Sequence, residues 1–313
     1  MIGNSLNVSK LREVLQYELK RETKYQPIFS IPQQDKNAVT LEERDKIVSH
    51  LLTLNKQFGF HPESFALAAS ILDRFLYLVK AQKKYLPCIV VACYFLAVKI
   101  IEEEEDLPGA SELLDAIGCS FSVSDLLRME RIILAKLDWD LNRVTALSFL
   151  QAFHALSVAS GCVSPHAVPH HLQLLTNKLE LLLCQHEFLS YRPSTLALAL
   201  MIQDLNSSLR QWIHLVQSFQ TEIKVPEWEL NACFIAVSGF LDMAFSYDDD
   251  FAGELDLKNV DNDEDLKLSE ADHYKCSSPL IRALALETNC SFEFDAKIPP
   301  NNVKISRMLS AVA

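Results

Sequence analysis

Glycine is scarce in this chain, with only 7 among 313 residues. Glycine supplies the positive φ angles of hairpin turns and the close backbone approach of phosphate-binding loops. A glycine-poor chain therefore disfavours both, and no glycine-rich phosphate loop, H-E-x-x-H motif or G-x-S-x-G motif occurs. Hydrophobic residues make up 49% of the chain, enough for a sizeable core. We expect an all-α protein with no cofactor and no enzymatic activity of its own.

Basic residues are also in short supply. The chain has 29 Lys and Arg against 41 Asp and Glu, a net charge of −12. Residues 248–313 hold 14 acidic and 7 basic residues, and that composition disfavours a packed core. We expect this acidic tail to be largely disordered. Because neither part of the chain offers a basic face, we expect no nucleic-acid partner.

Long hydrophobic runs are scarce as well, and we expect no secretory leader. The longest apolar stretch, Leu86 to Val98, is shorter than the roughly 20 residues that a membrane span needs. The first residues lack a basic flank before an apolar core. The 8 cysteines are scattered without a C-x-x-C pair, which is typical of reduced thiols. We expect an intracellular protein with no disulfides and no membrane partner.

Hydrophobic spacing predicts one helix in the N-terminal segment 1–38, where Leu11, Leu15 and Leu19 share a face. Five helices are predicted in residues 39–143, the third being apolar all round and therefore central. A short helix is expected near residues 109–117. Helix starts are indicated by a Thr40–Glu43 capping box, Pro62, Pro87 and a second capping pattern at Ser122–Asp125.

The order of helices recurs further along the chain. A shift of about 106 residues lays Leu147 over Leu41, and Pro193 over Pro87. We therefore predict a second five-helix unit at residues 144–247.

One group of residues has spacings that a zinc site uses, namely Cys162, His166, His170 and His171. Pro165 and Pro169 mark this segment as a loop between helices, where histidines are commonly polar filler. We expect no metal site.

Several short segments resemble the cyclin box over about residues 10–140. They are Asp73-Arg74-Phe75-Leu76, Ala97-Val98-Lys99 and Arg128-Met129-Glu130. Segments 15–27 and 146–155 are most similar to the cyclin G and cyclin I branch, whereas the second unit resembles a cyclin box by architecture only.

The resemblance implies a regulatory subunit of a cyclin-dependent-kinase-like kinase, acting in the nucleus and cytoplasm in cell-cycle or related signalling. Lys99 and Glu130 match cyclin residues that hydrogen-bond the kinase backbone beside its αC helix, and Leu96 and Ile100 match residues that receive that helix. Two structural alternatives stay open. Lys99 suits the C-terminal end of a helix, and Glu130 suits a solvated helix face.

Arg44 and Asp73 match a pair that forms an internal salt bridge in cyclins. Many cell-cycle cyclins also carry an apolar docking patch on the first helix of the box. At the matching positions this chain has Glu43, Lys46, Ile47 and His50. We therefore expect no conventional docking of Arg-x-Leu substrate peptides. This departure leaves a second function open, a non-activating adaptor for another protein such as a phosphatase regulatory subunit.

Overall fold

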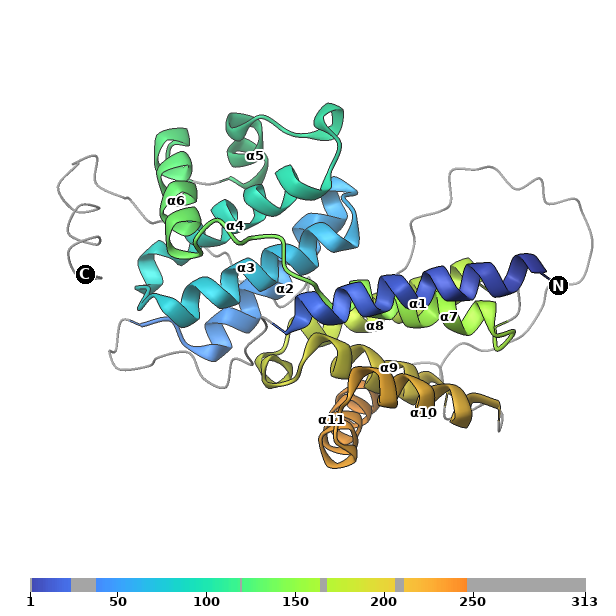
Figure 1. Cartoon of the computed structure of the whole chain (residues 1–313). Coiled ribbons are helices and arrows are strands. Elements are labelled where there is room, and N and C mark those ends of the chain that lie inside the picture. The colour runs from blue at the N-terminus through green and yellow to red at the C-terminus, as the bar shows by residue number, and fades with distance from the viewer. Residues whose placement is uncertain (1, 24–37, 119, 164–167, 206–210, 247–313) are drawn as a thin grey trace, which may run out of the picture.

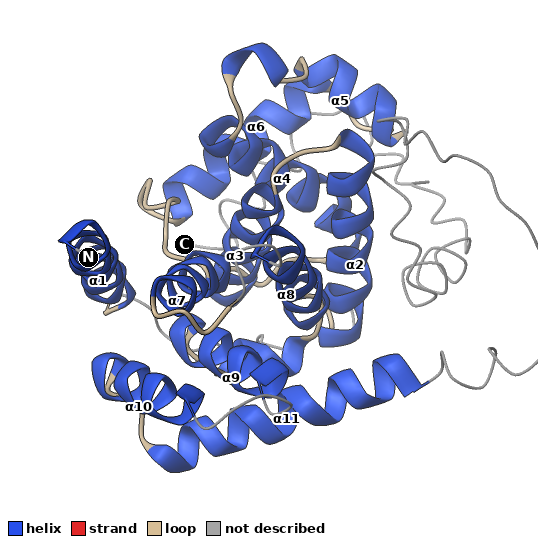
Figure 2. Ribbon diagram, turned by 90° about the vertical axis from the view of Figure 1, so that its right-hand side faces the viewer, coloured by secondary structure: helices blue, strands red, loops and turns tan. Residues whose placement is uncertain are grey.

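A computed structural model describes residues 2–23, 38–118, 120–163, 168–205 and 211–246. All the regular elements in these ranges are helices, apart from one isolated bridge between Ala38 and Gln82 (Figure 2). The all-α prediction is confirmed. The acidic tail at residues 248–313 lies outside the described residues.

The first unit has the five predicted helices (Figure 1). They are α2 (Leu41–Phe58), α3 (Pro62–Leu78), α4 (Leu86–Ile101), α5 (Ala110–Ile117) and α6 (Val123–Lys136). Short 3-10 turns at Lys83–Tyr85 and Glu104–Asp106 precede and follow α4. The described part of the second unit also holds five helices, α7 (Ala146–Ala159), α8 (Val168–Leu183), α9 (Pro193–Leu205), α10 (Gln211–Ile223) and α11 (Glu227–Ser246).

Local sequence signals set the helix ends of the first unit. Thr40 and Glu43 form a reciprocal capping box at the start of α2, and Ser122 and Asp125 form another at the start of α6. At the end of α2, Gly59 adopts a φ of 70°, which glycine tolerates without steric cost. These caps satisfy backbone groups that the helices leave free.

Each unit is built around one nearly fully buried helix. In α4, all residues from Cys88 to Val98 are buried, and α2, α3 and α6 pack around it. In the second unit, α9 is the buried central helix, with Leu196 to Met201 buried against α7, α10 and α11. The recurrence predicted from Pro87 and Pro193 is therefore present in the fold.

Two helical segments are long and apolar enough to cross a membrane by length and composition alone. They are Lys83–Ile101, of which 67% of the apolar window is buried, and Glu227–Phe245, of which 28% is buried. The first is longer than the apolar stretch read from the sequence, because it includes the 3-10 turn Lys83–Tyr85 and the helix continues past Val98 to Ile101. Since α4 is the central helix of the first unit, its apolar character is explained by the core.

The N-terminal helix α1 (Ile2–Glu22) packs on the second unit rather than on the first. Figure 1 shows it lying alongside α7. Leu15 is fully buried in the second core, and Val8, Leu11 and Leu19 pack against that core. The spacing of apolar residues predicted this helix, but it did not predict that the helix packs on the second unit.

The two units contact each other through α2 and α3 on one side and α7, α8 and the 3-10 turn His186–Ser190 on the other. Polar contacts also cross this boundary, among them one from the hydroxyl of Thr145 to Glu63 Oε1 at 2.7 Å. Asp45 Oδ2 lies 2.5 Å from His186 Nδ1, and Lys56 Nζ lies 2.9 Å from Glu180 Oε2.

Candidate functional site

Lys99 and Glu130 come together at the edge of the first unit. Lys99 lies in the last turn of α4 and Glu130 in the middle of α6, and their side chains form an ion pair. The Lys99 side chain is 36% exposed, whereas that of Glu130 is 8% exposed. Lys99 Nζ also lies 4.2 Å from the centroid of the Phe95 ring, a cation–π contact.

The helix sequences explain this placement. The α4 helix is apolar up to Val98, so Lys99 is its first charged residue. On α6, Leu126, Met129 and Ile133 are buried at helical spacing and fix which face meets α4. Glu130, next to this buried stripe, therefore lies at its margin. The ammonium and the carboxylate neutralise each other there and remain reachable on the lysine side.

The apolar residues predicted with this pair differ in exposure. Leu96 is 5% exposed and belongs to the first core, so it offers little surface to another molecule. Ile100 is 38% exposed. Leu127, one turn before Glu130 on α6, is also 38% exposed and was not singled out from the sequence.

Trp139 is a second residue that sequence reasoning missed. It is 75% exposed, just after the end of α6, and its backbone N–H donates to the Leu134 carbonyl at 2.9 Å. Asp138 and Trp139 have φ angles of 51° and 59°, a left-handed conformation that is costly for non-glycine residues. The only signal in the sequence is a tryptophan between two aspartates directly after an apolar helix pattern.

Arg44 and Asp73 form a buried, two-point ion pair between α2 and α3. Arg44 Nε donates to Asp73 Oδ1 at 2.8 Å, and Nη2 donates to Oδ2 at 2.7 Å. Asp45 accepts a third hydrogen bond at 3.1 Å. Burial lowers the pKa of Arg44, but the carboxylates of Asp73 and Asp45 outweigh it and raise the pKa above its usual value.

The residues at the docking-patch positions do not form an apolar surface. Ile47 is buried in the first core, and Glu43 is engaged by the Thr40 cap and by Lys83 Nζ at 2.8 Å. Lys46 is exposed. His50 is half-buried, and burial lowers its pKa.

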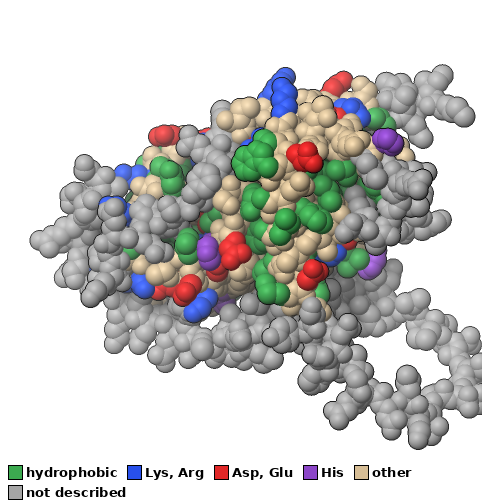
Figure 3. Space-filling view, turned by 90° about the horizontal axis from the view of Figure 1, so that it is seen from below, with side chains coloured by type: hydrophobic (Ala, Val, Ile, Leu, Met, Phe, Trp, Pro, Cys, Tyr) green, Lys and Arg blue, Asp and Glu red, His purple; other side chains and the backbone are tan. Residues whose placement is uncertain are grey.

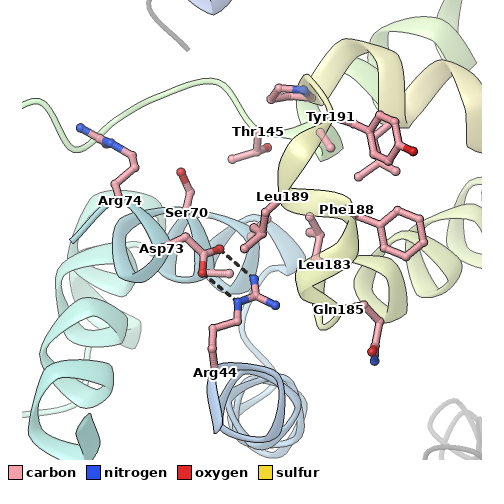
Figure 4. Close-up of a pocket in the computed structure, with 15 residues that line it drawn as sticks. Arg44, Ser70, Asp73, Arg74, Thr145, Leu183, Gln185, Phe188, Leu189 and Tyr191 are labelled. Atoms are coloured by element: carbon pink, nitrogen blue, oxygen red, sulfur yellow. Dashed lines mark hydrogen bonds and ion pairs between the residues drawn. The ribbon is translucent and has the colours of Figure 1, made fainter. Parts of the chain in front are cut away.

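A small cavity of about 70 Å³ lies between the two units. Figure 4 shows the Arg44–Asp73 pair on one side and Leu183, Phe188 and Leu189 on the other. The side chain of Arg74 extends away from the pair. Among the described residues Arg74 has no carboxylate partner: its Nη2 donates to the Asp140 main-chain carbonyl at 2.6 Å, and burial lowers its pKa to about 10. The rest of the cavity wall is mainly apolar, so we assign no chemical role to this cavity.

The suggested zinc ligands are not assembled into a site. Among the described residues no group of three or more His, Cys, Asp or Glu is placed to hold a metal ion, and His166 lies outside them. His171 instead hydrogen-bonds His154 at 3.0 Å and Asp204 at 2.8 Å. None of the cysteines that the structure describes forms a disulfide.

Comparison with known proteins identifies the family. Residues 13–142 match the family model for the cyclin N-terminal domain. Bovine Cyclin-G1 is 34% identical over 219 residues, which cover 67% of this chain and 71% of that protein. The chain belongs to the cyclin family. Human Cyclin-I2 is 34% identical over 194 residues, 60% of this cyclin and 53% of that protein, which agrees with the predicted G and I branch.

A solved structure supports the tandem fold. The crystal structure of a viral cyclin from herpesvirus saimiri aligns with a TM-score of 0.62 at 23% identity, covering 74% of this cyclin and 99% of the viral chain. The prediction of two tandem cyclin-box units is therefore confirmed. Cyclins are regulatory, non-catalytic proteins, so a regulatory role follows from the family.

Proposed function

We propose that this cyclin binds a cyclin-dependent-kinase-like serine/threonine kinase through the surface around Lys99 and Glu130. The observation that carries the proposal is that one ammonium and one carboxylate, from two different helices, meet at the edge of the first unit. Main-chain carbonyl and N–H groups of a partner are suitable acceptors and donors for these two groups.

The pair is suited to binding because it is already organised in the free protein. Glu130 has lost most of its contact with water, and Phe95 holds the ammonium of Lys99. Little side-chain entropy is then lost when a partner adds its own hydrogen bonds. Ile100, Leu127 and Trp139 supply exposed apolar surface on the same helices or directly after them. A helix that binds there gains apolar burial together with polar contacts.

In the proposed complex the kinase αC helix lies against Ile100, Leu127 and Trp139. Binding favours the inward position of that helix, which completes the Lys–Glu ion pair of the kinase and orders its phosphate-handling residues. The cyclin contributes no catalytic group. It acts by shifting the kinase population toward its active conformation.

The test captures partners from cell extract on the purified full chain, identifies them by mass spectrometry and measures phosphoryl transfer. The Lys99→Ala plus Glu130→Ala variant should lose captured kinase and kinase activity by about tenfold or more. The matched control is Arg12→Ala plus Glu222→Ala, which removes the Arg–Glu ion pair between α1 and α10. It should change neither kinase capture nor kinase activity. Equal kinase capture by both variants would contradict the proposal.

A second candidate is a non-activating adaptor that holds another protein, such as a phosphatase regulatory subunit. One observation favours it: α2 has charged and buried residues where many cell-cycle cyclins have an apolar substrate-docking patch. The same capture experiment separates the two. A phosphatase subunit retained by the Lys99→Ala plus Glu130→Ala variant, without kinase activity in the wild-type eluate, would favour the adaptor.

For either role we propose action in cell-cycle or related signalling, in the nucleus and cytoplasm. Fluorescence imaging of the tagged chain tests this placement.

A further inference from the structure

The last helix, α11, has apolar residues on two opposite faces. Its inner face packs on α9 and the second core through Leu230, Cys233, Val237, Leu241 and Ala244. Figure 2 shows α11 running along the outer edge of the molecule. The outer face therefore has no helix of the described chain over it.

Large apolar side chains on this outer face are exposed to an unusual degree. Trp228 is 73% exposed, Ile235 69% and Met243 67%. Ala232 and Gly239 lie between them along the helix and are also exposed. Figure 3 views the molecule from this side and shows hydrophobic side chains gathered in the middle of it. We call these five residues the α11 stripe.

The stripe has the pattern of a helix that pairs with another helix. Its members follow one another at spacings of four, three, four and four residues, which keeps them on one side of the helix. Large side chains alternate with small residues, so a facing helix can contact the large side chains and approach closely at the small residues between them.

Gly239 supports this interpretation independently. A glycine within a helix is less favourable than an alanine. Gly239 has no positive φ, and a Cβ added to it meets no atom within 4 Å, so nothing within the described chain requires glycine there. Close approach of a second helix backbone is a common reason for a glycine at such a position.

We propose that the α11 stripe is a self-association surface, on which α11 of a second copy of this chain packs antiparallel. The stripe is complementary to itself in this register. With the two-fold axis beside Ile235, Trp228 of each copy lies opposite Met243 of the other, and Ala232 lies opposite Gly239. Large side chains then meet at both ends, the small pair allows close approach, and the two Ile235 side chains meet at the centre.

Other features of the helix agree with a second copy as the occupant. Residues 227–246 contain no Lys or Arg, so the stripe lacks the basic rim of helices that bind anionic membrane surfaces. Two chains of net charge −12 repel each other at a distance. Salt screens this repulsion while leaving apolar contact intact, so self-association strengthens as ionic strength rises.

The first test is sedimentation velocity on the full chain from about 1 to about 100 µM, where a small helix pair is expected to associate. Wild type should shift from the 35.4 kDa monomer to a dimer. Ile235→Glu should weaken the association at least about tenfold. Leu174→Glu, the same change at a 42% exposed leucine on α8, should leave it unaltered. Circular dichroism checks that each variant keeps its helical content.

The second test fixes the register. Trp228→Lys and Met243→Glu should each weaken the dimer, whereas the double variant places Lys opposite Glu twice and should restore it to within about threefold of wild type. The two positions are about 22 Å apart along one helix, so they cannot compensate each other within a single chain.

Three results would overturn the proposal. The first is a wild-type chain that stays monomeric over the whole concentration range. The second is a monomer whose α11 amides are protected from hydrogen exchange by residues 247–313, or one that sediments with phosphatidylcholine vesicles, because the stripe then has another occupant. The third is a dimer that Ile235→Glu leaves unchanged or that the double variant does not restore.

Discussion

The guanidinium of Arg44 is a full positive charge in a residue that is only 1% exposed. Burial of a charge is tolerated when hydrogen bonds and an opposite charge replace its water. Asp73 supplies two such bonds and Asp45 a third. The pair fixes α3 against α2 and so sets the position of α4, the helix that ends in Lys99.

Replacing Asp73 by alanine should lower the free energy of unfolding by roughly 3–5 kcal/mol, because Arg44 would remain buried without its main partner. Urea denaturation followed by far-UV circular dichroism measures this loss. Lys83→Ala, which breaks the more exposed Lys83–Glu43 pair, should cost at most about 1 kcal/mol and serves as the control. A similar loss of unfolding free energy in both variants would show that the buried pair contributes no more to stability than the exposed pair.

Sequence reasoning reached Arg44 and Asp73 only through the family resemblance, since helical spacing does not pair residues 29 positions apart. It missed the contacts of Asp45 with His186 and of Glu22 with Ser194, which join residues 141 and 172 positions apart. A single sequence contains no local signal for such pairs. They depend on how whole helices pack.

The N-terminal helix α1 contacts the second unit through both apolar packing and polar interactions. Leu15 enters the second core, and Arg12 forms an ion pair with Glu222 of α10. At the end of the helix, the buried carboxylate of Glu22 accepts hydrogen bonds from the N–H and the hydroxyl of Ser194, both at 2.7 Å. Because Ser194 lies in the first turn of α9, Glu22 caps the central helix of the second unit.

We predict that Glu22→Ala loosens α1. The change leaves the N–H and hydroxyl of Ser194 without their partner, at a cost of about 1–3 kcal/mol. Hydrogen exchange should speed up in residues 8–22 and in the first turn of α9, and the melting temperature should fall. Glu13→Ala, at an exposed position on the same helix, is the control and should leave both unchanged. Unaltered exchange in the Glu22 variant would mean that apolar packing alone holds α1.

The helices themselves were predictable because their signals are local. Capping residues such as Thr40 and Ser122, the prolines in the first turns of α3, α4 and α9, and the spacing of apolar residues specify where helices form. Which faces remain exposed was not predictable in the same way. The α11 helix is apolar on both sides, so its sequence alone does not tell that Ile235 faces outward while Val237 is buried.

At the scale of the whole molecule, the two units and α1 meet around Glu63. This residue lies in the first turn of α3, and its Oε1 accepts a hydrogen bond at 2.7 Å from the hydroxyl of Thr145, the N-cap of α7. Burial raises the pKa of Glu63 to about 7, and neighbouring Glu18 adds to the shift, while Thr145 and Arg21 oppose it.

The raised pKa makes the stability of this junction depend on pH. A carboxyl group favoured in its protonated form stabilises the fold fully below its unfolded pKa of 4.5, and this contribution is lost as pH rises through about 7. Glu63→Gln keeps an acceptor for Thr145 but cannot ionise. We therefore expect it to match wild type near pH 4 and to exceed its stability on the order of 2–3 kcal/mol at pH 8.

Urea denaturation at several pH values measures this difference. Glu103→Gln, a change at an exposed position in the loop after α4, is the control and should follow wild type throughout. If Glu63→Gln were instead less stable than wild type at pH 8, the ionised carboxylate would be holding α1, α3 and α7 together. The junction would then be strengthened by the charge of Glu63, and its pKa would have to lie below the ordinary value rather than above it.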